Sequence, residues 1–144
     1  RRVADAKEAR YRTLLEREGV TALPGAREWV RTLHDAGWRQ AVASSAPRRN
    51  VDLVLDRLGL RDRIDAVVGS EDVAQGKPAP DVFLQAADRV GSAPSRCVVV
   101  EDAEVGIEAA RRAGMPCIGI GVAADVTVAS PAELPGDTFE RMTG

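Results

Sequence analysis

The chain has 144 residues, of which 44% are hydrophobic and 29% are charged, and its net charge at pH 7 is −2. This composition is typical of one globular domain with a core of its own. The near-neutral charge argues against nucleic acid or an anionic membrane as a partner, and no apolar run approaches the roughly 20 residues that span a bilayer. The single histidine, His34, excludes a metal site built on several histidines. Cys97 and Cys117 each lie in an apolar run, so we expect buried thiols and a cytoplasmic location.

Hydrophobic spacing alternates between helical and extended patterns along the chain, and glycines follow most of the helical segments. The patterns predict helices at residues 3–18, 26–36, 48–58, 80–90 and 105–113, and strands at residues 38–44, 66–69, 97–100 and 116–120. The strand at 97–100 (CVVV) is apolar throughout, as in a parallel sheet that is covered on both faces. The tail after Val122 is weakly patterned, and we predict no element in it.

This alternation predicts an α/β domain with a doubly wound parallel sheet and right-handed crossovers. In sheets of this kind, ligands bind at the carboxyl ends of the strands. The residues that follow each predicted strand are therefore the candidates for chemistry.

Two serines, Ser44 and Ser45, lie where the first of these strands ends. Small hydroxyl residues ahead of a helix can present hydroxyl and backbone N–H groups to an anion. The same serines could instead cap the helix that follows. The sequence leaves both interpretations open.

A lysine, Lys77, lies between Gly76 and Pro78 in the segment after the second strand. Gly76 lets the backbone turn freely and Pro78 stiffens the exit, so we expect the ammonium group to point at a fixed position. A cation held in this way suits a phosphate group or a carboxylate. The alternative is an ordinary exposed lysine in a loop.

Two acids, Glu101 and Asp102, follow the most apolar strand. Carboxylates there are costly to desolvate unless a cation compensates, and Mg²⁺ prefers carboxylate oxygens. The alternative is that Asp102 caps the next helix, in which Gly106 could allow a close approach of the backbone. A phosphate cradle, a cation and an acid pair are together the groups that phosphoryl transfer requires.

Three segments resemble motifs of the haloacid dehalogenase superfamily. AVASSAP resembles the second motif of that family, GKPAPDVF the third and VVVEDAEVGIEAARRAGM the fourth, in the family's order and spacing. The resemblance extends from about Val3 to Val122. It implies a Rossmann-like core of the haloacid dehalogenase type, in the branch with a helical cap that includes enzymes similar to β-phosphoglucomutase and phosphoglycolate phosphatase.

The resemblance also implies a role for each candidate residue. Ser44 matches the hydroxyl that hydrogen-bonds the transferring phosphoryl group, with the backbone N–H of Ser45 beside it. Lys77 matches the lysine that pairs with the nucleophile and with the phosphate. Asp102 matches the Mg²⁺ ligand, and Glu101 matches its acidic neighbour at the metal site.

By the same resemblance, residues 1–18 are the last helix of the cap, a remnant of that domain, and residues 19–144 are the core. Lys7 falls where caps of the β-phosphoglucomutase type place a lysine that faces the substrate. The family's first motif, Asp-x-Asp at the end of the central strand, occurs nowhere in the 144 residues. We therefore expect the nucleophilic aspartate outside this chain, a gap in the sheet that an N-terminal segment of the same protein completes, and poor stability and no activity for these residues alone.

The function implied is a Mg²⁺-dependent phosphatase that acts on a small phosphorylated metabolite, such as a sugar phosphate or phosphoglycolate, through an aspartyl-phosphate. Three alternatives remain. They are a sugar phosphomutase of the β-phosphoglucomutase type, a truncated phosphate-binding domain without activity, and a receiver-type signalling domain. The receiver is disfavoured because its acid pair follows the first strand, whereas Lys77 precedes the acid pair of this chain.

Overall fold

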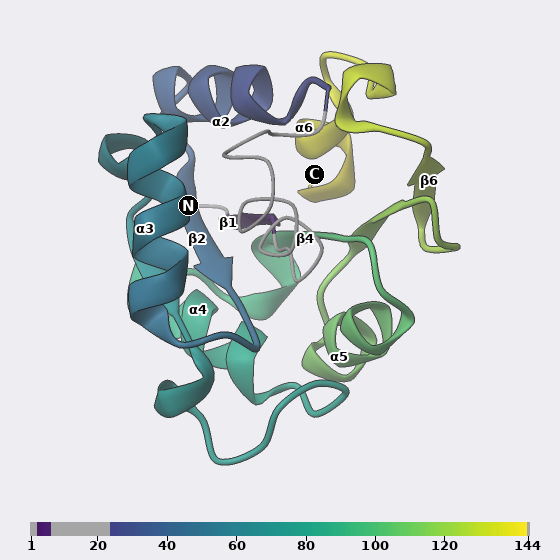
Figure 1. The fold of residues 1–144 in the computed structure, drawn as a ribbon. Coiled ribbons are helices and arrows are strands. Elements are labelled where there is room, and N and C mark those ends of the chain that lie inside the picture. The colour runs from purple at the N-terminus through teal and green to yellow at the C-terminus, as the bar shows by residue number, and fades with distance from the viewer. Residues whose placement is uncertain (1–2, 7–23, 144) are drawn as a thin grey trace.

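The computed structural model describes the backbone of residues 3–6 and all atoms of residues 24–143. These residues form a parallel sheet in the order β3-β2-β1-β4-β5-β6, with helices on both faces (Figure 1). The strands are β1 (Val3–Ala6), β2 (Arg39–Ala43), β3 (Ala66–Val68), β4 (Cys97–Glu101), β5 (Cys117–Ile120) and β6 (Val126–Val128). The helices are α2 (Ala26–Asp35), α3 (Arg48–Leu58), α4 (Asp81–Val90), α5 (Glu104–Ala113) and α6 (Thr138–Thr143), and the 3-10 turns are η1 (Arg61–Arg63), η2 (Ser70–Asp72), η3 (Pro94–Arg96) and η4 (Pro131–Glu133).

The helices and strands predicted between residues 26 and 120 are confirmed, and the observed ends lie within about one residue of the predicted ones. Glycines account for much of this agreement. Gly59, Gly91 and Gly114 follow α3, α4 and α5 with φ values of 69°, 70° and 75°. Glycine adopts this left-handed conformation without steric cost, so it ends a helix where other residues would let it continue.

The centre of the sheet departs from the prediction. Val3–Ala6 forms a strand, β1, where we expected the start of a helix. β1 pairs in parallel with both β2 and β4, so the expected gap is wrong, and with it the reason for expecting poor stability. The strand that fills the position carries Asp5 but no Asp-x-Asp motif. The remainder of the expected helix, including Lys7, and the domain boundary at residue 18 lie outside the described residues.

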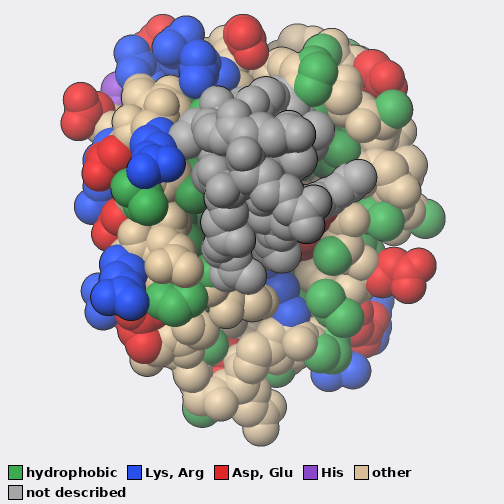
Figure 2. Space-filling model, in the orientation of Figure 1, with side chains coloured by type: hydrophobic (Ala, Val, Ile, Leu, Met, Phe, Trp, Pro, Cys, Tyr) green, Lys and Arg blue, Asp and Glu red, His purple; other side chains and the backbone are tan. Residues whose placement is uncertain are grey.

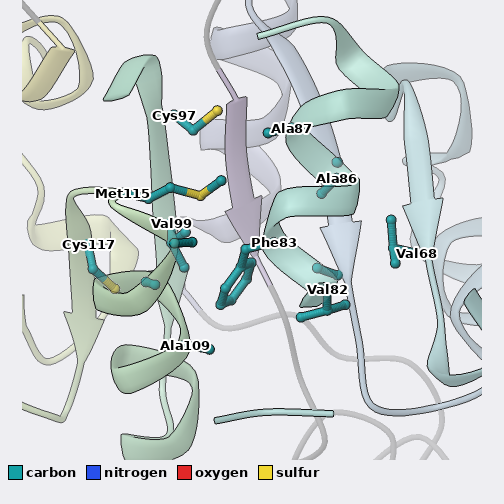
Figure 3. Packing of buried hydrophobic residues seen from close by; sticks show 14 of the residues in the cluster. Val68, Val82, Phe83, Ala86, Ala87, Cys97, Val99, Ala109, Met115 and Cys117 are labelled. Atoms are coloured by element: carbon teal, nitrogen blue, oxygen red, sulfur yellow. The ribbon is translucent and has the colours of Figure 1, made fainter. Parts of the chain in front are cut away.

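Two layers of helices cover the sheet. On one face, side chains of β2, β3, β4 and β5 pack against α4 and α5, with Phe83 and Met115 among the buried residues (Figure 3). On the other face, the sheet packs against α2, α3 and α6. All four residues of β5 are buried, and so are Cys97 and Val98 of β4. The prediction of a parallel sheet covered on both faces is therefore confirmed.

The C-terminal tail contains elements that the sequence pattern did not predict. Val126–Val128 adds β6 to one edge of the sheet, and Thr138–Thr143 forms α6. The ring of Phe139 is buried, with its centroid 5.1 Å from that of Trp29 and 5.8 Å from that of Trp38. Elements this short hold too few residues for a periodic pattern, so their packing partners decide their conformation.

No helix within residues 24–143 is long and apolar enough to cross a membrane. Cys97 and Cys117 are buried, as predicted. Acidic and basic side chains are interspersed along the left margin of the face shown in Figure 2, in keeping with the small net charge.

The aromatic cluster around Phe139 allows a test of the role of α6. We expect Phe139→Ala to lower the free energy of unfolding by about 3–5 kcal/mol, because the buried ring is lost and a cavity remains. The measurement is denaturant unfolding at 25 °C. The control is Leu53→Ala, which removes a side chain that is 51% exposed. Similar losses for the two variants would contradict a core role for α6.

Candidate functional site

The ammonium group of Lys77 lies at the carboxyl edge of the sheet. Its Nζ is 3.2 Å from the carbonyl oxygen of Ala43, the last residue of β2, and 3.0 Å from Oε2 of Glu101, the last residue of β4. Because β1 lies between β2 and β4, the ammonium spans the end of the central strand. The Lys77 side chain is 2% exposed, so the interpretation as an ordinary loop lysine is wrong.

The carboxylate of Glu101 is held by its own strand end. Its Oε1 accepts hydrogen bonds from the backbone N–H groups of Asp102 at 3.0 Å and Ala103 at 3.3 Å, while Oε2 faces Lys77. Helix α5 leaves space for this carboxylate at Gly106, where a Cβ atom would overlap it. The close approach expected at Gly106 is therefore confirmed.

The Lys77–Glu101 ion pair is buried, because the two side chains are 2% and 0% exposed. Removing two charges from water costs several kcal/mol per ion, and well-packed apolar residues would often stabilise a fold equally well. The hydrogen bonds described above and the Phe83 ring, whose centroid is 4.7 Å from Nζ, offset part of that cost. The burial of this pair is therefore weak evidence that it stabilises the fold.

The conformation of the segment that carries Lys77 agrees only in part with the prediction from the sequence. The Lys77–Pro78 peptide bond is cis, and the N–H of Ala79 donates to the carbonyl of Gly76 at 3.0 Å. Gly76 does not have a positive φ, and a Cβ there would meet nothing within 4 Å. The structure therefore does not require the backbone freedom that we predicted for Gly76.

Two contacts of the Lys77 ammonium group, with Phe83 and with the carbonyl of Ala43, were not predicted from the sequence. Phe83 lies in the first turn of α4, a few residues after Lys77, and its place in the segment GKPAPDVF was a signal that could have indicated it. Nothing in the sequence could indicate that the carbonyl of Ala43 contacts Lys77, because every residue carries the same backbone acceptor.

The hydroxyl group of Ser44 lies one residue beyond the Ala43 carbonyl. Ser44 is buried, and its Oγ accepts a hydrogen bond from the N–H of Ala46 at 3.0 Å, which leaves the hydroxyl proton to donate elsewhere. Ser45 is exposed. The N-cap of α3 is Pro47, so the capping interpretation is wrong for both serines.

The side chain of Asp102 is half-buried, next to Glu101. The N-cap of α5 is Ala103, so the capping interpretation is wrong for Asp102 as well. Within residues 24–143 there is no group of three or more potential metal ligands. Two adjacent carboxylates still fit Mg²⁺, which proteins often bind through one or two carboxylates together with substrate phosphate. Because the oxygens of Glu101 accept three hydrogen bonds, one of them from Lys77, Glu101 has limited capacity to bind a metal itself.

The register of β1 limits what Asp5 can do. β1 ends at Ala6, which lies opposite Val100, and Asp5 lies opposite Val99. The backbone of Asp5 is therefore two residues short of the level of Glu101, or about 7 Å along the strand. A nucleophile directed at a phosphate beside Lys77 would belong at the level of Glu101, so the register does not assign that role to Asp5.

A family model of haloacid dehalogenase-like hydrolases matches residues 2–114. The chain belongs to this family. The motifs that suggested the family in the sequence lie within the matched residues, except for Met115, the last residue of the fourth motif. The receiver-type alternative is therefore wrong.

Several known proteins of this family resemble the chain. Validoxylamine A 7'-phosphate phosphatase of Streptomyces hygroscopicus subsp. limoneus is 31% identical over 129 residues, which cover 90% of this chain and 61% of that protein. β-Phosphoglucomutase of Bacillus subtilis is 37% identical over 117 residues, which cover 78% of this chain and 51% of that protein. The crystal structure of Rhodobacter sphaeroides CbbY in complex with xylulose-(1,5)bisphosphate matches with a TM-score of 0.80 at 28% identity, over 89% of this chain and 62% of that one. The chain thus spans about half to three-fifths of the length of these relatives.

The contact between Gly106 and Glu101 leads to a prediction about the ion pair. We expect Gly106→Ala to lower the free energy of unfolding by about 1–3 kcal/mol, since the new methyl group displaces a buried carboxylate. The measurement is thermal and denaturant unfolding. Gly76→Ala is the matched control, because a Cβ there meets open space and φ is not positive. Equal stability of the two variants would show that the carboxylate of Glu101 can move without loss.

Proposed function

We propose that the protein is a Mg²⁺-dependent phosphatase that hydrolyses the phosphate monoester of a small metabolite through an aspartyl-phosphate. The observation that carries the proposal is the buried ammonium of Lys77, which Glu101 holds across the end of the central strand. A cation fixed at the carboxyl edge of a parallel sheet lies where ligands bind in such folds. Two relatives in the family, a phosphatase and a phosphomutase, have names that state phosphoryl chemistry.

Three groups of the chain would bind the phosphoryl group. The hydroxyl of Ser44 donates to one phosphoryl oxygen, and the backbone N–H of Ser45 donates to another. The ammonium of Lys77 attracts the negative charge of the phosphate and of the attacking carboxylate. Because these groups are held in place before the substrate arrives, they stabilise the charge of the transition state without reorganising.

The metal would be held mainly by Asp102, with Glu101 beside it. Bound there, Mg²⁺ supplies positive charge that neutralises phosphoryl oxygens and helps to orient them. The residues of the chain do the remaining work of positioning. Glu101 serves chiefly to hold Lys77, as its hydrogen bonds indicate.

The family mechanism needs a nucleophilic aspartate, which this sequence does not contain as Asp-x-Asp. In that mechanism a carboxylate oxygen forms a bond to phosphorus while the ester P–O bond breaks, and the alcohol leaves with a proton from a general acid. Water then attacks phosphorus, which releases inorganic phosphate and restores the carboxylate. For these 144 residues alone, we expect phosphate binding and no turnover.

The substrate class that we propose is a phosphorylated sugar or a similar small metabolite. β-Phosphoglucomutase and CbbY with xylulose-(1,5)bisphosphate are the relatives that favour this class. The same likeness to β-phosphoglucomutase makes a sugar phosphomutase the second candidate, in which a sugar hydroxyl replaces water as acceptor. Apart from Val3–Ala6, which forms β1, the assignment of residues 1–18 to a cap stays a prediction, as do the substrate-facing role of Lys7 and a cytoplasmic location.

Phosphate release by the full-length protein tests the proposal. We expect activity on sugar phosphates with Mg²⁺ and its loss with EDTA. Lys77→Ala should lower kcat about 100-fold to 1,000-fold, as does removal of one donor from a preorganised anion site. Asp102→Asn should raise the Mg²⁺ concentration needed for half-maximal rate. Activity in EDTA, or near-native rates for both variants, would refute the proposal.

A further inference from the structure

The two loops that carry the proposed phosphate-binding groups are joined to each other at the edge of the sheet. We call residues 44–47, between β2 and α3, the serine loop, and residues 69–80, between β3 and α4, the lysine loop. The N–H of Ser70 in the lysine loop donates to the carbonyl of Ala46 in the serine loop at 2.9 Å. The position of Lys77 relative to the serines therefore depends on how firmly these loops are held together.

The carboxylate of Asp72 is the main link between the elements around the lysine loop. Its Oδ2 accepts a hydrogen bond from the N–H of Gly69 at 2.8 Å and lies 3.1 Å from Nε of Arg48. Its Oδ1 accepts a hydrogen bond from Nη2 of Arg89 at 3.1 Å. The Asp72 side chain is only 9% exposed. One carboxylate with little exposure thus holds the beginning of the lysine loop and two arginines.

The two arginines belong to the helices that border the two loops. Arg48 is the first residue of α3, directly after the serine loop. Arg89 lies in the last turn of α4, the helix that follows the lysine loop, and its Nη1 also donates to the carbonyl of Val67 in β3 at 2.7 Å. Asp72 therefore connects the end of the serine loop to both sides of the lysine loop.

The backbone of the lysine loop at Gly69 lies so close to Arg48 that no side chain would fit between them. A Cβ at Gly69 would lie 2.6 Å from the backbone nitrogen of Arg48 and 2.6 Å from Oε1 of Glu71, distances that real Cβ atoms essentially never show. The N–H of Arg48 donates to that same Oε1 at 2.9 Å. The backbone itself is thus shaped to bring α3 against the lysine loop.

An ordinary surface ion pair differs from this arrangement, and the chain contains one for comparison. Glu108 in α5 accepts hydrogen bonds from Arg111 at 2.9 Å and Arg112 at 2.7 Å, so it also binds two arginines. All three residues lie on one helix, and the Glu108 side chain is 33% exposed. Exposed pairs of this kind contribute little to stability and connect no separate elements.

The charge of Asp72 is maintained at neutral pH. The N–H of Gly69, followed by Arg89 and Arg48, holds the pKa of the Asp72 carboxyl below its ordinary value of 3.8, against the effect of burial. The carboxylate is therefore ionised under the conditions of any phosphatase assay, and both arginines face a full negative charge.

We propose that Asp72 is a positioning residue for Lys77, which it keeps in place by holding the lysine loop against the serine loop through Arg48 and Arg89. This inference rests on the proposed function and adds a residue that does not touch the phosphate. Loss of Asp72 frees the lysine loop, and the ammonium then leaves its place across the end of the central strand. A displacement of about 1 Å in a catalytic group can lower the rate about 100-fold.

The experiment uses the full-length protein and two readouts. The first is kcat and KM for a sugar phosphate. The second is the rate at which acetic anhydride acetylates Lys77, followed by mass spectrometry of peptides. The second readout is simple to interpret because mass spectrometry identifies the peptide that contains Lys77, and the Lys77 side chain is 2% exposed in the native structure.

We expect Asp72→Ala to lower kcat about tenfold to 100-fold with a smaller change in KM, and to raise the acetylation rate of Lys77 several-fold. Arg48→Met should show both effects more weakly, because it removes one partner of Asp72 and keeps the backbone contact with Glu71. Glu108→Ala is the matched control, since it also removes a carboxylate that binds two arginines, and it should change neither readout.

Native kcat and native acetylation in folded Asp72→Ala would overturn the proposal, and so would equal effects of Glu108→Ala. If Asp72→Ala does not fold, Arg48→Met decides between the same two outcomes. Acetylation needs no turnover, so it tests the positioning of Lys77 even if the wild-type protein proves inactive on every phosphate ester. Inactivity of the wild-type protein on every phosphate ester would refute the proposed function. The acetylation rates would then decide whether Asp72 positions Lys77.

Discussion

The candidate site depends on a buried ion pair between Lys77 and Glu101 that spans the end of the central strand. Such a pair is costly to bury and is tolerable only when each charge finds further partners. The carbonyl of Ala43 supplies one for the ammonium, and two backbone N–H groups supply them for the carboxylate. Each of these partners lies at the carboxyl end of a strand, so the parallel sheet brings them together.

Close backbone contacts make this arrangement possible. The absence of a side chain at Gly106 gives the carboxylate of Glu101 its space, and the absence of one at Gly69 lets α3 approach the loop that carries Lys77. The Asp72 carboxylate then holds this loop to the helices on either side. The site is thus built from rigid elements, which suits catalysis by positioning and charge stabilisation.

Membership of the family, whose model matches residues 2–114, does not by itself assign a reaction. The relatives include a phosphatase and a phosphomutase on the same fold, and this chain spans only about half to three-fifths of their length. A phosphatase and a phosphomutase differ in the acceptor of the phosphoryl group, which is water in the first and a sugar hydroxyl in the second.

The sequence by itself determined the helices and strands between residues 26 and 120, because amphipathic periodicity and left-handed glycines such as Gly59 are local properties. It also indicated the lysine and the acids at the strand ends. Only the tertiary structure decided that Glu101 binds Lys77, that Ser44 and Asp102 do not cap helices, and that Val3–Ala6 fills the centre of the sheet. These outcomes depend on contacts between residues far apart in the chain, whose partners no local pattern identifies.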